Sequence, residues 1–487
     1  MKLFSKVAIL AAILCLVVLP SYAQGVKEAV VKIYTVYNRH NYYDPWQMYG
    51  QGMRSGSGCI IDGKRILTNA HVVGDQTFIQ VKRAGQAKKY TASVKMVAHE
   101  CDLAILGVKD DSFFSEVEPL KIGDLPRVRD GVAVYGFPQG GDELCITEGV
   151  VSRVEHHWYV HSQEYLLTCQ IDASINPGSS GGPVVKDDKI VGVAFQAGSG
   201  ENIGYMVSVP IIEHFMKDIE DDKYDGIPGI GISWQEMENP DIRKRYKMSE
   251  EQTGILVNKI YPGSPAEGML KSEDIILSID GKGIENDGTI EFRKGERTSF
   301  RYIVQNKYIG DIVELQILRN GELKNVPIEL TKTPEAFRLV SNEQYDVPPV
   351  YYILGGLVFE PLTLNFLKTS WGASWYSDAP RNLVDYYLRG EPTENQKEVI
   401  ILVKVLADEV NVGYHNRRWE VVSEVNGKKI KDMRDLVDAF ESNKDKYHII
   451  VNDKGYRIIL DRAKVEESAE RILKTYNISS KKFLDEL

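Results

Sequence analysis

Short apolar runs separated by turns fill the chain between residues 27 and 222, and this pattern constrains the fold more than any other feature. Four of the runs read AVVKIYTVY, GSGCIID, VAVYGF and KIVGVAF, and Gly, Asp and Pro lie between them. Many short strands at close spacing are typical of a β-barrel or a β-sandwich. The segment PIIEHFMKDIEDD departs from the pattern, because its apolar residues recur at helical spacing. We therefore expect a mainly β domain over residues 24–222 that ends in a helix.

A glycine-rich loop, Gly178-Ser179-Ser180-Gly181-Gly182, lies in the later part of this domain. Glycine has no Cβ and permits a tight turn, so the Ser180 hydroxyl is expected to project from the loop. The N–H groups that precede this serine can then converge on one point as an oxyanion hole. Because Gly/Ser runs also form ordinary loops, the string needs support from other residues.

Two other segments supply the partners that a serine nucleophile needs. His71 lies in RILTNAHVVGD, and Asp102 opens the apolar run of CDLAIL. A serine hydroxyl requires a base, and a histidine can take its proton and return it to the leaving amine. A buried carboxylate holds the histidine in the required tautomer, and the order His, Asp, Ser is that of chymotrypsin. Asp75 is a rival carboxylate, but its Gly-Asp turn directly after His71 is poorly placed to reach the ring.

Several stretches of the first domain together resemble the HtrA/DegP (Do-like, Deg) serine proteases: GSGCIID, TNAHVV, DLAIL, GFPQGGDELCITEGVVS, QIDASINPGSSGGPVV and ENIGYMVSVPII. Later stretches are similar to the plant nucleolar and chloroplast branch of that family: WQEMENPDIRK, DGTIEFRKGER and YYILGGLVFEPLT. The resemblance covers nearly the whole chain after residue 23. It implies a chymotrypsin-like double β-barrel protease domain followed by two α+β PDZ domains.

The resemblance also implies roles for individual residues. His71, Asp102 and Ser180 would form the catalytic triad. The N–H groups of Gly178 and Ser180 would form the oxyanion hole, with Ser179 as a candidate third donor. Ile175 would line the pocket for the side chain before the scissile bond, which favours small or medium apolar residues.

A second type of domain is expected from residue 226 onward. Gly229-Ile230-Gly231-Ile232 resembles the carboxylate-binding loop of a PDZ domain, in which successive N–H groups face a peptide C-terminus and the next strand accepts the peptide. We place the first PDZ domain at 226–333, a polar linker at 334–350, a second PDZ-like domain at 351–464, and a C-terminal helix and tail at 465–487. The second PDZ domain could serve assembly or regulation as well as peptide capture.

The first 23 residues have the features of a signal peptide. Lys2 and Lys6 precede an apolar run from Val7 to Leu19, and Ser21-Tyr22-Ala23 provides a cleavage site. The run is shorter than the roughly 20 apolar residues that a membrane-spanning helix needs. We expect cleavage after Ala23, a periplasmic location with full secretion as an alternative, and no stable membrane span in the mature chain.

The charge and the motifs of the chain limit the partners and cofactors that we expect. A net charge of −10 offers no electrostatic basis for nucleic-acid binding. The chain contains no P-loop and no dinucleotide-binding fingerprint, so we expect no cofactor. His156, His157 and His161 lack a metal-ligand spacing, and we interpret them as part of a surface loop with no metal. Buried free thiols are favoured over disulfides, although the sequence leaves the state of the remaining cysteines open: Cys59, Cys101, Cys145 and Cys169.

These observations predict an ATP-independent serine endopeptidase that degrades misfolded exported proteins and captures C-termini through PDZ domains. An aromatic loop with Tyr42, Tyr43, Trp46 and Tyr49 suggests a contact in a trimer-based homo-oligomer, with packing over the barrel as the alternative. The alternative function is a chaperone or peptide-binding scaffold whose oxyanion hole stays unformed.

Overall fold

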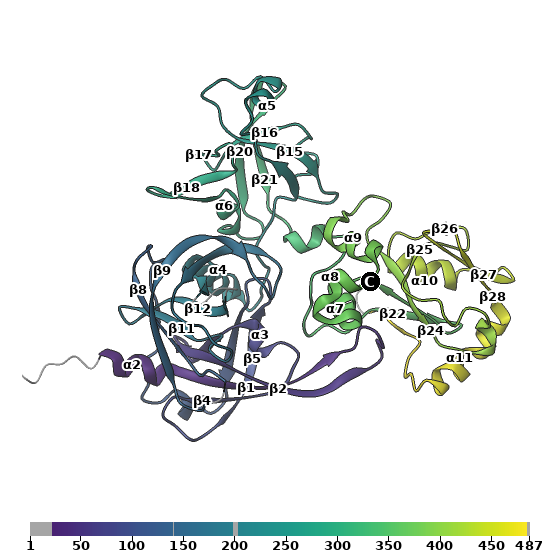
Figure 1. Cartoon of the computed structure of the whole chain (residues 1–487), viewed down its shortest axis with the longest axis horizontal. Coiled ribbons are helices and arrows are strands. Elements are labelled where there is room, and N and C mark those ends of the chain that lie inside the picture. The colour runs from purple at the N-terminus through teal and green to yellow at the C-terminus, as the bar shows by residue number, and fades with distance from the viewer. Residues whose placement is uncertain (1–21, 140, 198–202, 485–487) are drawn as a thin grey trace, which may run out of the picture.

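The computed structural model describes residues 22–139, 141–197 and 203–484. Figure 1 shows a double-barrel body with one smaller domain above it and a second one beside it. Almost all of the expected signal peptide lies outside the described residues. The mainly β protease fold with two following PDZ domains, expected from the sequence, is confirmed.

The first barrel follows the short helix α2 (Tyr22–Ala29). It is closed, with strand order β1-β2-β3-β6-β5-β4, so none of its strands has a free edge. Helix α3 (Ala70–Val73) follows β3 directly and carries His71. The strands are β1 (Val30–His40), β2 (Met48–Ile61), β3 (Arg65–Thr68), β4 (Gln76–Arg83), β5 (Tyr90–Ala98) and β6 (Leu103–Val108).

The second barrel closes through the pairing of β11 with β12, and the short strand β7 (Lys121–Ile122) lies parallel to β12. Helix α4 (Val209–Asp218) ends the domain and buries Ile211, Ile212 and Phe215. The helix predicted from the apolar spacing is therefore present. The barrel strands are β8 (Gly131–Gly136), β9 (Cys145–Trp158), β10 (Tyr165–Ile171), β11 (Pro183–Lys186), β12 (Lys189–Ala197) and β13 (Gly204–Ser208).

The first PDZ domain has strand order β14-β15-β16-β20-β21, and β14 lies at the edge of the sheet. Helix α6 (Arg301–Gln305) follows the hairpin formed by β18 and β19. The strands are β14 (Ile232–Gln235), β15 (Ile255–Ile260), β16 (Ile275–Ile279), β18 (Thr289–Arg293), β19 (Glu296–Ser299), β20 (Ile312–Arg319) and β21 (Glu322–Glu329).

The second PDZ domain has strand order β28-β27-β25-β24-β23-β22-β29. Strand β29 (Lys482–Phe483) pairs with β22, so part of the predicted tail belongs to the sheet of this domain. The remaining elements are β22 (Tyr351–Leu354), β23 (Leu357–Pro361), α7 (Leu364–Trp371), α8 (Trp375–Asp378), α9 (Arg381–Arg389), β24 (Ile400–Val405), β25 (Glu420–Val425), α10 (Met433–Glu441), β27 (Tyr447–Asn452), β28 (Arg457–Asp461) and α11 (Arg462–Thr475).

The segment between the two PDZ domains is packed rather than free. It begins with a 3-10 turn at Pro334–Phe337. Its apolar side chains are buried: Phe337, Leu339, Val340 and Tyr345. Residues 334–350 therefore form a packed segment between the two PDZ domains, the interdomain segment.

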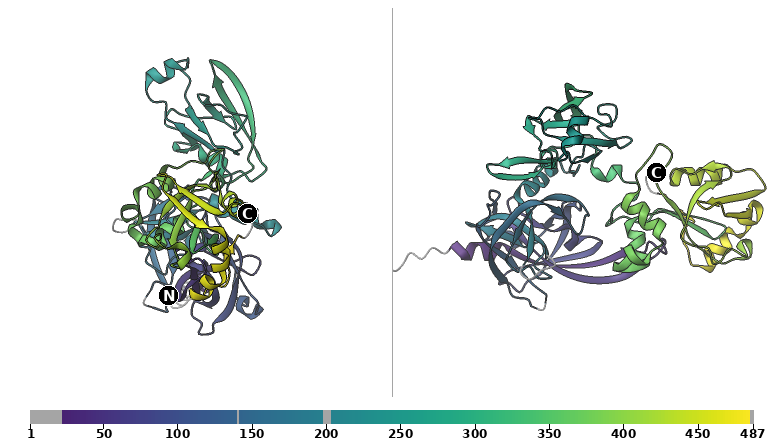
Figure 2. Two further views of the ribbon diagram at one scale, coloured as in Figure 1. Left: turned by 90° about the vertical axis from the view of Figure 1, so that its right-hand side faces the viewer. Right: turned by 45° about the horizontal axis from the view of Figure 1, so that its top comes forward.

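The aromatic loop lies at the tip of the β1–β2 hairpin, which extends from the barrel to the second PDZ domain (Figures 1 and 2). The Tyr42 hydroxyl donates a 2.9 Å hydrogen bond to the carbonyl of Val347. The Trp46 ring packs edge-on against Tyr351, with ring centroids 6.3 Å apart. Tyr42 and Trp46 therefore pack against the interdomain segment and the second PDZ domain of the same chain, whereas Tyr49 at the same tip is 58% exposed.

Candidate active site

His71 and Asp102 form a close pair at the end of the first barrel. His71 Nδ1 lies 2.7 Å from Asp102 Oδ2, and the His71 backbone N–H donates to Oδ1 at 2.9 Å. The side chain of Asn69 donates to the Asp102 carbonyl at 2.8 Å, which fixes the aspartate from behind. Asp102 sits in the turn between β5 and β6 with φ of 56°, a left-handed conformation that Asp adopts more readily than most residues.

The electrostatics of this pair suit a carboxylate that stays ionised. Burial alone raises the pKa of Asp102, but the charge and hydrogen bonds of His71 outweigh burial and hold that pKa below its ordinary value. An ionised Asp102 accepts the Nδ1–H of His71. The lone pair of the neutral imidazole is then on Nε2, the nitrogen that faces away from the aspartate.

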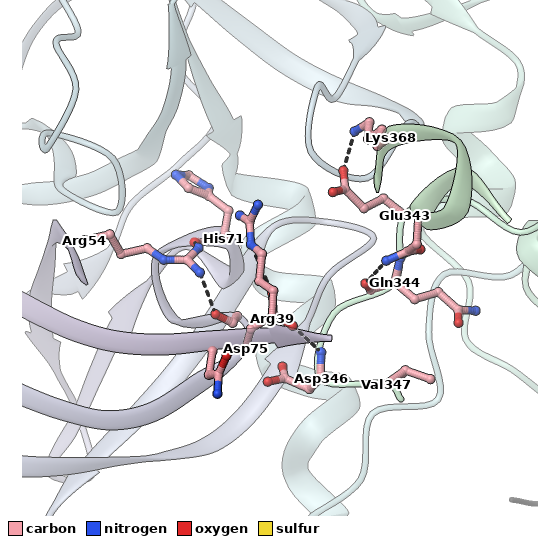
Figure 3. A network of polar contacts seen from close by, with 12 residues as sticks. Arg39, Arg54, His71, Asp75, Glu343, Gln344, Asp346, Val347 and Lys368 are labelled. Carbon is pink, nitrogen blue, oxygen red and sulfur yellow. Dashed lines mark hydrogen bonds and ion pairs between the residues drawn. The ribbon is translucent and has the colours of Figure 1, made fainter. Parts of the chain in front are cut away.

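Asp75, the rival carboxylate, has other partners. Its side chain is 3.5 Å from Arg39 Nε and accepts the backbone N–H of Asp346 at 2.9 Å. Figure 3 shows this network beside the His71 turn, where Arg54 donates to the carbonyls of His71 and Gly74. Asp75 therefore anchors the interdomain segment to the protease domain and does not contact the His71 ring.

Ser57 on strand β2 holds the glycine-rich loop through its backbone and its hydroxyl. The Ser57 backbone N–H donates to the Ser180 carbonyl at 2.8 Å, and the Ser57 hydroxyl donates to the Gly178 carbonyl at 2.8 Å. Gly181 has φ of 83°, and a Cβ there would lie 2.2 Å from the Ser57 carbonyl. Only glycine fits this position, so the loop that carries Ser180 is built for close approach.

Hydrogen bonds hold the carbonyls that precede the N–H groups of Gly178 and Ser180. The Pro177 carbonyl accepts from Gln139 at 2.7 Å, and the Ser179 carbonyl accepts from Gly182 at 3.0 Å. In a trans peptide the following N–H points opposite to the carbonyl, so the N–H groups of Gly178 and Ser180 face away from these bonds. The Ser179 N–H donates to Asn176 at 2.9 Å, so it is not available as the third oxyanion donor that the sequence suggested.

No hydrogen bond joins His71 to Ser180 within the described ranges, and a different ring contacts the histidine. His161, in the turn between β9 and β10, stacks on His71 with ring centroids 3.8 Å apart and an angle of 11° between the rings. Burial, followed by the neighbouring His71, lowers the pKa of His161 to about 4. His161 thus lies in a half-buried turn, whereas His156 and His157 lie on strand β9, so the interpretation of a surface loop was wrong for those two residues.

The other two histidines of that trio point elsewhere. His156 is buried against the first PDZ domain, 2.7 Å from Thr298 Oγ1 and 2.8 Å from Gln305 Oε1. His157 stacks on Tyr205, with ring centroids 4.5 Å apart. The trio therefore does not converge on one point.

Ile175 is buried beside strand β13. A Cβ on Gly204 would lie 2.7 Å from Ile175 Cδ1, so the isoleucine packs directly on the backbone of that strand. Ile175 thus lies five residues before Ser180, beside β13, in the core of the second barrel.

The Gly229–Ile232 loop borders a cavity of about 360 Å³. The protease domain, the interdomain segment and both PDZ domains contribute to its lining. Edge strand β14 and helix α6 form two of its walls, as in a peptide-binding groove. The interdomain segment contributes Phe337, whose ring lies 3.3 Å from the position of a Cβ on Gly231. The Gly229 N–H is already bonded to the Lys332 carbonyl at 2.9 Å, so it is not available to a ligand.

The corresponding groove of the second PDZ domain is filled. Strand β23 pairs with β22 on one side and β24 on the other, so it has no free edge for a peptide. Tyr352 of β22 stacks on Phe440 of α10, with ring centroids 5.9 Å apart. β-Strand addition requires a free edge strand. The first PDZ domain has one in β14, whereas the corresponding strand β23 of the second domain is paired on both sides.

Comparison with known domain families divides the chain as the fold does. Residues 56–193 match a trypsin-like peptidase domain, and residues 228–330 and 340–485 each match a PDZ domain. The Arabidopsis thaliana protein named putative protease Do-like 3, mitochondrial, is 39% identical over 455 residues, which is 93% of this chain and 79% of that protein. The chain belongs to the Do-like protease family.

Other relatives agree with this assignment. Protease Do-like 2, chloroplastic, of Arabidopsis thaliana is 38% identical over 467 residues, covering 94% of this chain and 75% of that one. The solved structure of the HtrA-type protease AlgW with a decapeptide has a TM-score of 0.51 and 24% identity, covering 64% of this chain and 99% of that one, which supports the shared fold. This Do-like chain is thus a serine endopeptidase with two PDZ domains.

The sequence offered no signal for three contacts at the site. The His161 stack, the Phe337 ring in the groove and the stack of Tyr345 on His99 (centroids 4.7 Å apart) all join segments far apart in the chain. In residues 22–139, 141–197 and 203–484, no helix is long and apolar enough to cross a membrane.

Proposed function

We propose that this Do-like protease hydrolyses peptide bonds with Ser180 as the nucleophile, His71 as the general base and Asp102 as the group that orients the histidine. The 2.7 Å contact between His71 and Asp102 carries the proposal. The ionised carboxylate presents the Nε2 lone pair of His71 to a serine hydroxyl. The N–H groups of Gly178 and Ser180 then stabilise the oxyanion of the tetrahedral intermediate, which an oxyanion hole does by about 3–4 kcal/mol per donor.

Cleavage requires His71 Nε2 and the Ser180 hydroxyl to come within hydrogen-bonding distance. The His161 ring is stacked on His71, so we infer that substrate binding displaces the β9–β10 turn. Ile175 would border the specificity pocket and favour small or medium apolar side chains.

The test uses reduced casein and the mature chain from Gln24, without ATP or added metal. We expect degradation by the wild type and none by Ser180→Ala. The Ser57→Ala variant removes a hydroxyl that bonds Gly178, and it should retain partial activity because the nucleophile remains. Equal inactivity of folded wild type and Ser180→Ala would reject the proposed triad chemistry and favour a chaperone or scaffold.

The first PDZ domain is proposed to capture substrate C-termini, and the second to serve assembly or regulation. Strand β14 is an edge strand, whereas β23 is paired on both sides. Arg301 lines the groove, and within the described residues no carboxylate lies at ion-pair distance from its guanidinium, although the charge of Glu164 in the same lining acts on it. A cation in this position suits a peptide carboxylate.

We propose misfolded proteins that have crossed a membrane as the substrates. The amino-terminal Lys residues and apolar run favour export with cleavage after Ala23, and on the sequence alone we expect the periplasm. The relatives named as mitochondrial or chloroplastic favour an organelle instead. Fractionation together with amino-terminal sequencing of the mature chain distinguishes these compartments.

The mature protein is proposed to form a homo-oligomer built from trimers. The hairpin tip gives this proposal partial support, because Tyr42 and Trp46 pack within the chain but Tyr49 is 58% exposed. Exposed apolar residues elsewhere on β2 and β4 remain available, notably Met53 at 83% exposure and Phe78 at 44%. Light scattering coupled to size-exclusion chromatography would measure the mass.

A further inference from the structure

His71, Asp102 and His161 form a cluster that peptide hydrolysis does not fully use. One ligand atom from each of the three lies within 4.8 Å of the other two. The triad needs His71 and Asp102 but gives no role to the imidazole of His161. Within the described ranges, neither ring nitrogen of His161 has a hydrogen-bond partner, whereas the buried His156 is bonded through both.

The two imidazoles of this cluster suit a transition metal such as zinc. Zinc takes imidazole nitrogens and carboxylate oxygens in tetrahedral sites. Magnesium and calcium prefer a shell made wholly of oxygen. The Asp102 carboxylate already accepts from His71 Nδ1 at 2.7 Å. This is the carboxylate–histidine arrangement that orients a zinc ligand and directs Nε2 toward the metal.

We propose that His71 and His161 bind a zinc ion together, with Asp102 orienting His71 from behind, and that this zinc reversibly inhibits the protease.

The geometry requires a small movement. Zinc–nitrogen bonds of about 2.0–2.1 Å in a tetrahedral site place two ligand atoms about 3.3 Å apart. The stacked rings are nearly parallel, so the His161 ring must tilt toward His71 Nε2 to share an ion. His161 lies in a turn between β9 and β10 and is only half-buried, which leaves it free to tilt. Solvent completes the coordination shell.

Inhibition follows from the chemistry of the base. A zinc ion on Nε2 occupies the lone pair that would accept the Ser180 proton, so the general base is lost while the metal is bound. This consequence rests on the proposed function, but metal binding itself does not. The two can therefore be tested separately.

Binding is measured first, with the full mature chain carrying Ser180→Ala, by competition for zinc with a chromophoric chelator. We expect one zinc ion to bind, and His161→Phe to weaken that binding by at least about tenfold, since loss of a supporting group alone costs 10–100-fold. Phenylalanine keeps a flat ring for the stack and removes only the nitrogens. The control is His157→Phe, another stacked histidine of the same hairpin, which should bind zinc as the parent does.

Activity is measured second, as casein cleavage relative to the metal-free rate of each variant. Micromolar zinc should inhibit the wild type, EDTA should restore it, and His161→Phe should need at least tenfold more zinc. Magnesium and calcium should not inhibit. Equal zinc binding by the parent and His161→Phe overturns the proposal, as does the absence of binding by the parent. If the wild type cleaves no casein, the proposed function fails while the chelator competition still decides the zinc site.

Discussion

At the residue scale, Asp102 determines whether His71 can act as a base. Asp102→Asn would keep the shape of the side chain, but its amide would favour the wrong tautomer of the histidine. We expect casein cleavage to fall by about 10⁴-fold, the loss typical of this substitution in a triad. The matched control is Asp75→Asn, which removes the carboxylate that follows the His71 turn and contacts Arg39 and the Asp346 backbone. A comparable loss in the control would show that charge near the turn matters in general and would contradict the assignment of Asp102.

A second prediction at this scale concerns His156 and pH. Burial lowers the pKa of His156 to about 4, from an ordinary value of about 6.5. Gln305 Oε1 can only accept, so His156 Nε2 donates to it, and Nδ1 accepts from the Thr298 hydroxyl. This hydrogen-bond pattern requires the neutral imidazole.

The unfolded chain therefore binds a proton between pH 6.5 and 4 that the folded chain does not. Stability from His156 is complete above pH 6.5 and is lost as the pH falls toward 4, by up to about 3 kcal/mol. His156→Gln should flatten this part of the profile of thermal unfolding midpoint against pH. A profile of unchanged steepness in the variant would assign the pH dependence to other groups.

At the element scale, we expect the interdomain segment to compete with peptides for the first PDZ groove. The Phe337 ring packs against Gly231 and stacks with Tyr261 at a centroid distance of 6.4 Å. Phe337→Ala should open the groove and raise the affinity for a peptide that ends in an apolar residue. The apparent affinity is reduced by the fraction of molecules in which the groove is closed, and the variant removes that reduction.

The measurement is fluorescence anisotropy of a labelled peptide, in the Ser180→Ala background so that no peptide is cleaved. Phe292→Ala is a suitable control, because Phe292 lies on strand β18 and packs on Tyr302 outside the groove. If both variants bind the peptide as the parent does, Phe337 does not limit access to the groove.

At the scale of the whole molecule, the β1–β2 hairpin connects the protease domain to the second PDZ domain. Lys404 makes an ion pair with Asp44 and lies 3.9 Å from the centroid of the Tyr43 ring and 5.5 Å from that of Trp46. Trp46→Ala removes both the contact with Lys404 and the edge-on contact with Tyr351. The second PDZ domain should then separate from the hairpin, with a larger radius of gyration in solution scattering and faster trypsin cleavage within residues 334–350.

Tyr49→Ala is the matched variant, since Tyr49 lies on the same hairpin and is 58% exposed. It should leave both measurements at the wild-type value. An unchanged radius and cleavage rate for Trp46→Ala would mean that other contacts, such as Tyr42 with Val347, hold the domain on their own.

Much of the fold and part of the site followed from local sequence. The short apolar runs predicted a β-barrel or a β-sandwich, since strand periodicity depends on neighbouring residues alone, and the family resemblance implied the double barrel. The Gly-Ser loop, the His71 turn and the start of the Asp102 strand were each recognisable within about ten residues. The structure brings His71 and Asp102 into contact and packs the Ser180 loop beside them.

Contacts that the sequence does not show decide whether an N–H group or an aromatic ring is free to meet another molecule. Ser179 was a reasonable third oxyanion donor until its N–H was found bonded to Asn176. Tyr42 and Trp46 had the composition of an exposed contact surface, yet the length of the hairpin carries them to another domain of the same chain.

The sequence by itself determined the types of domain, their order, and which serine, histidine and aspartate belong to the candidate triad, because these depend on local patterns and chain order. Only the tertiary structure decided that His161 stacks on His71, that Phe337 lies in the first PDZ groove and that the second groove is filled. The physical reason is that each of these contacts joins a loop or linker to a distant segment. Such contacts depend on how the packed domains are placed, and no local pattern of residues encodes that placement.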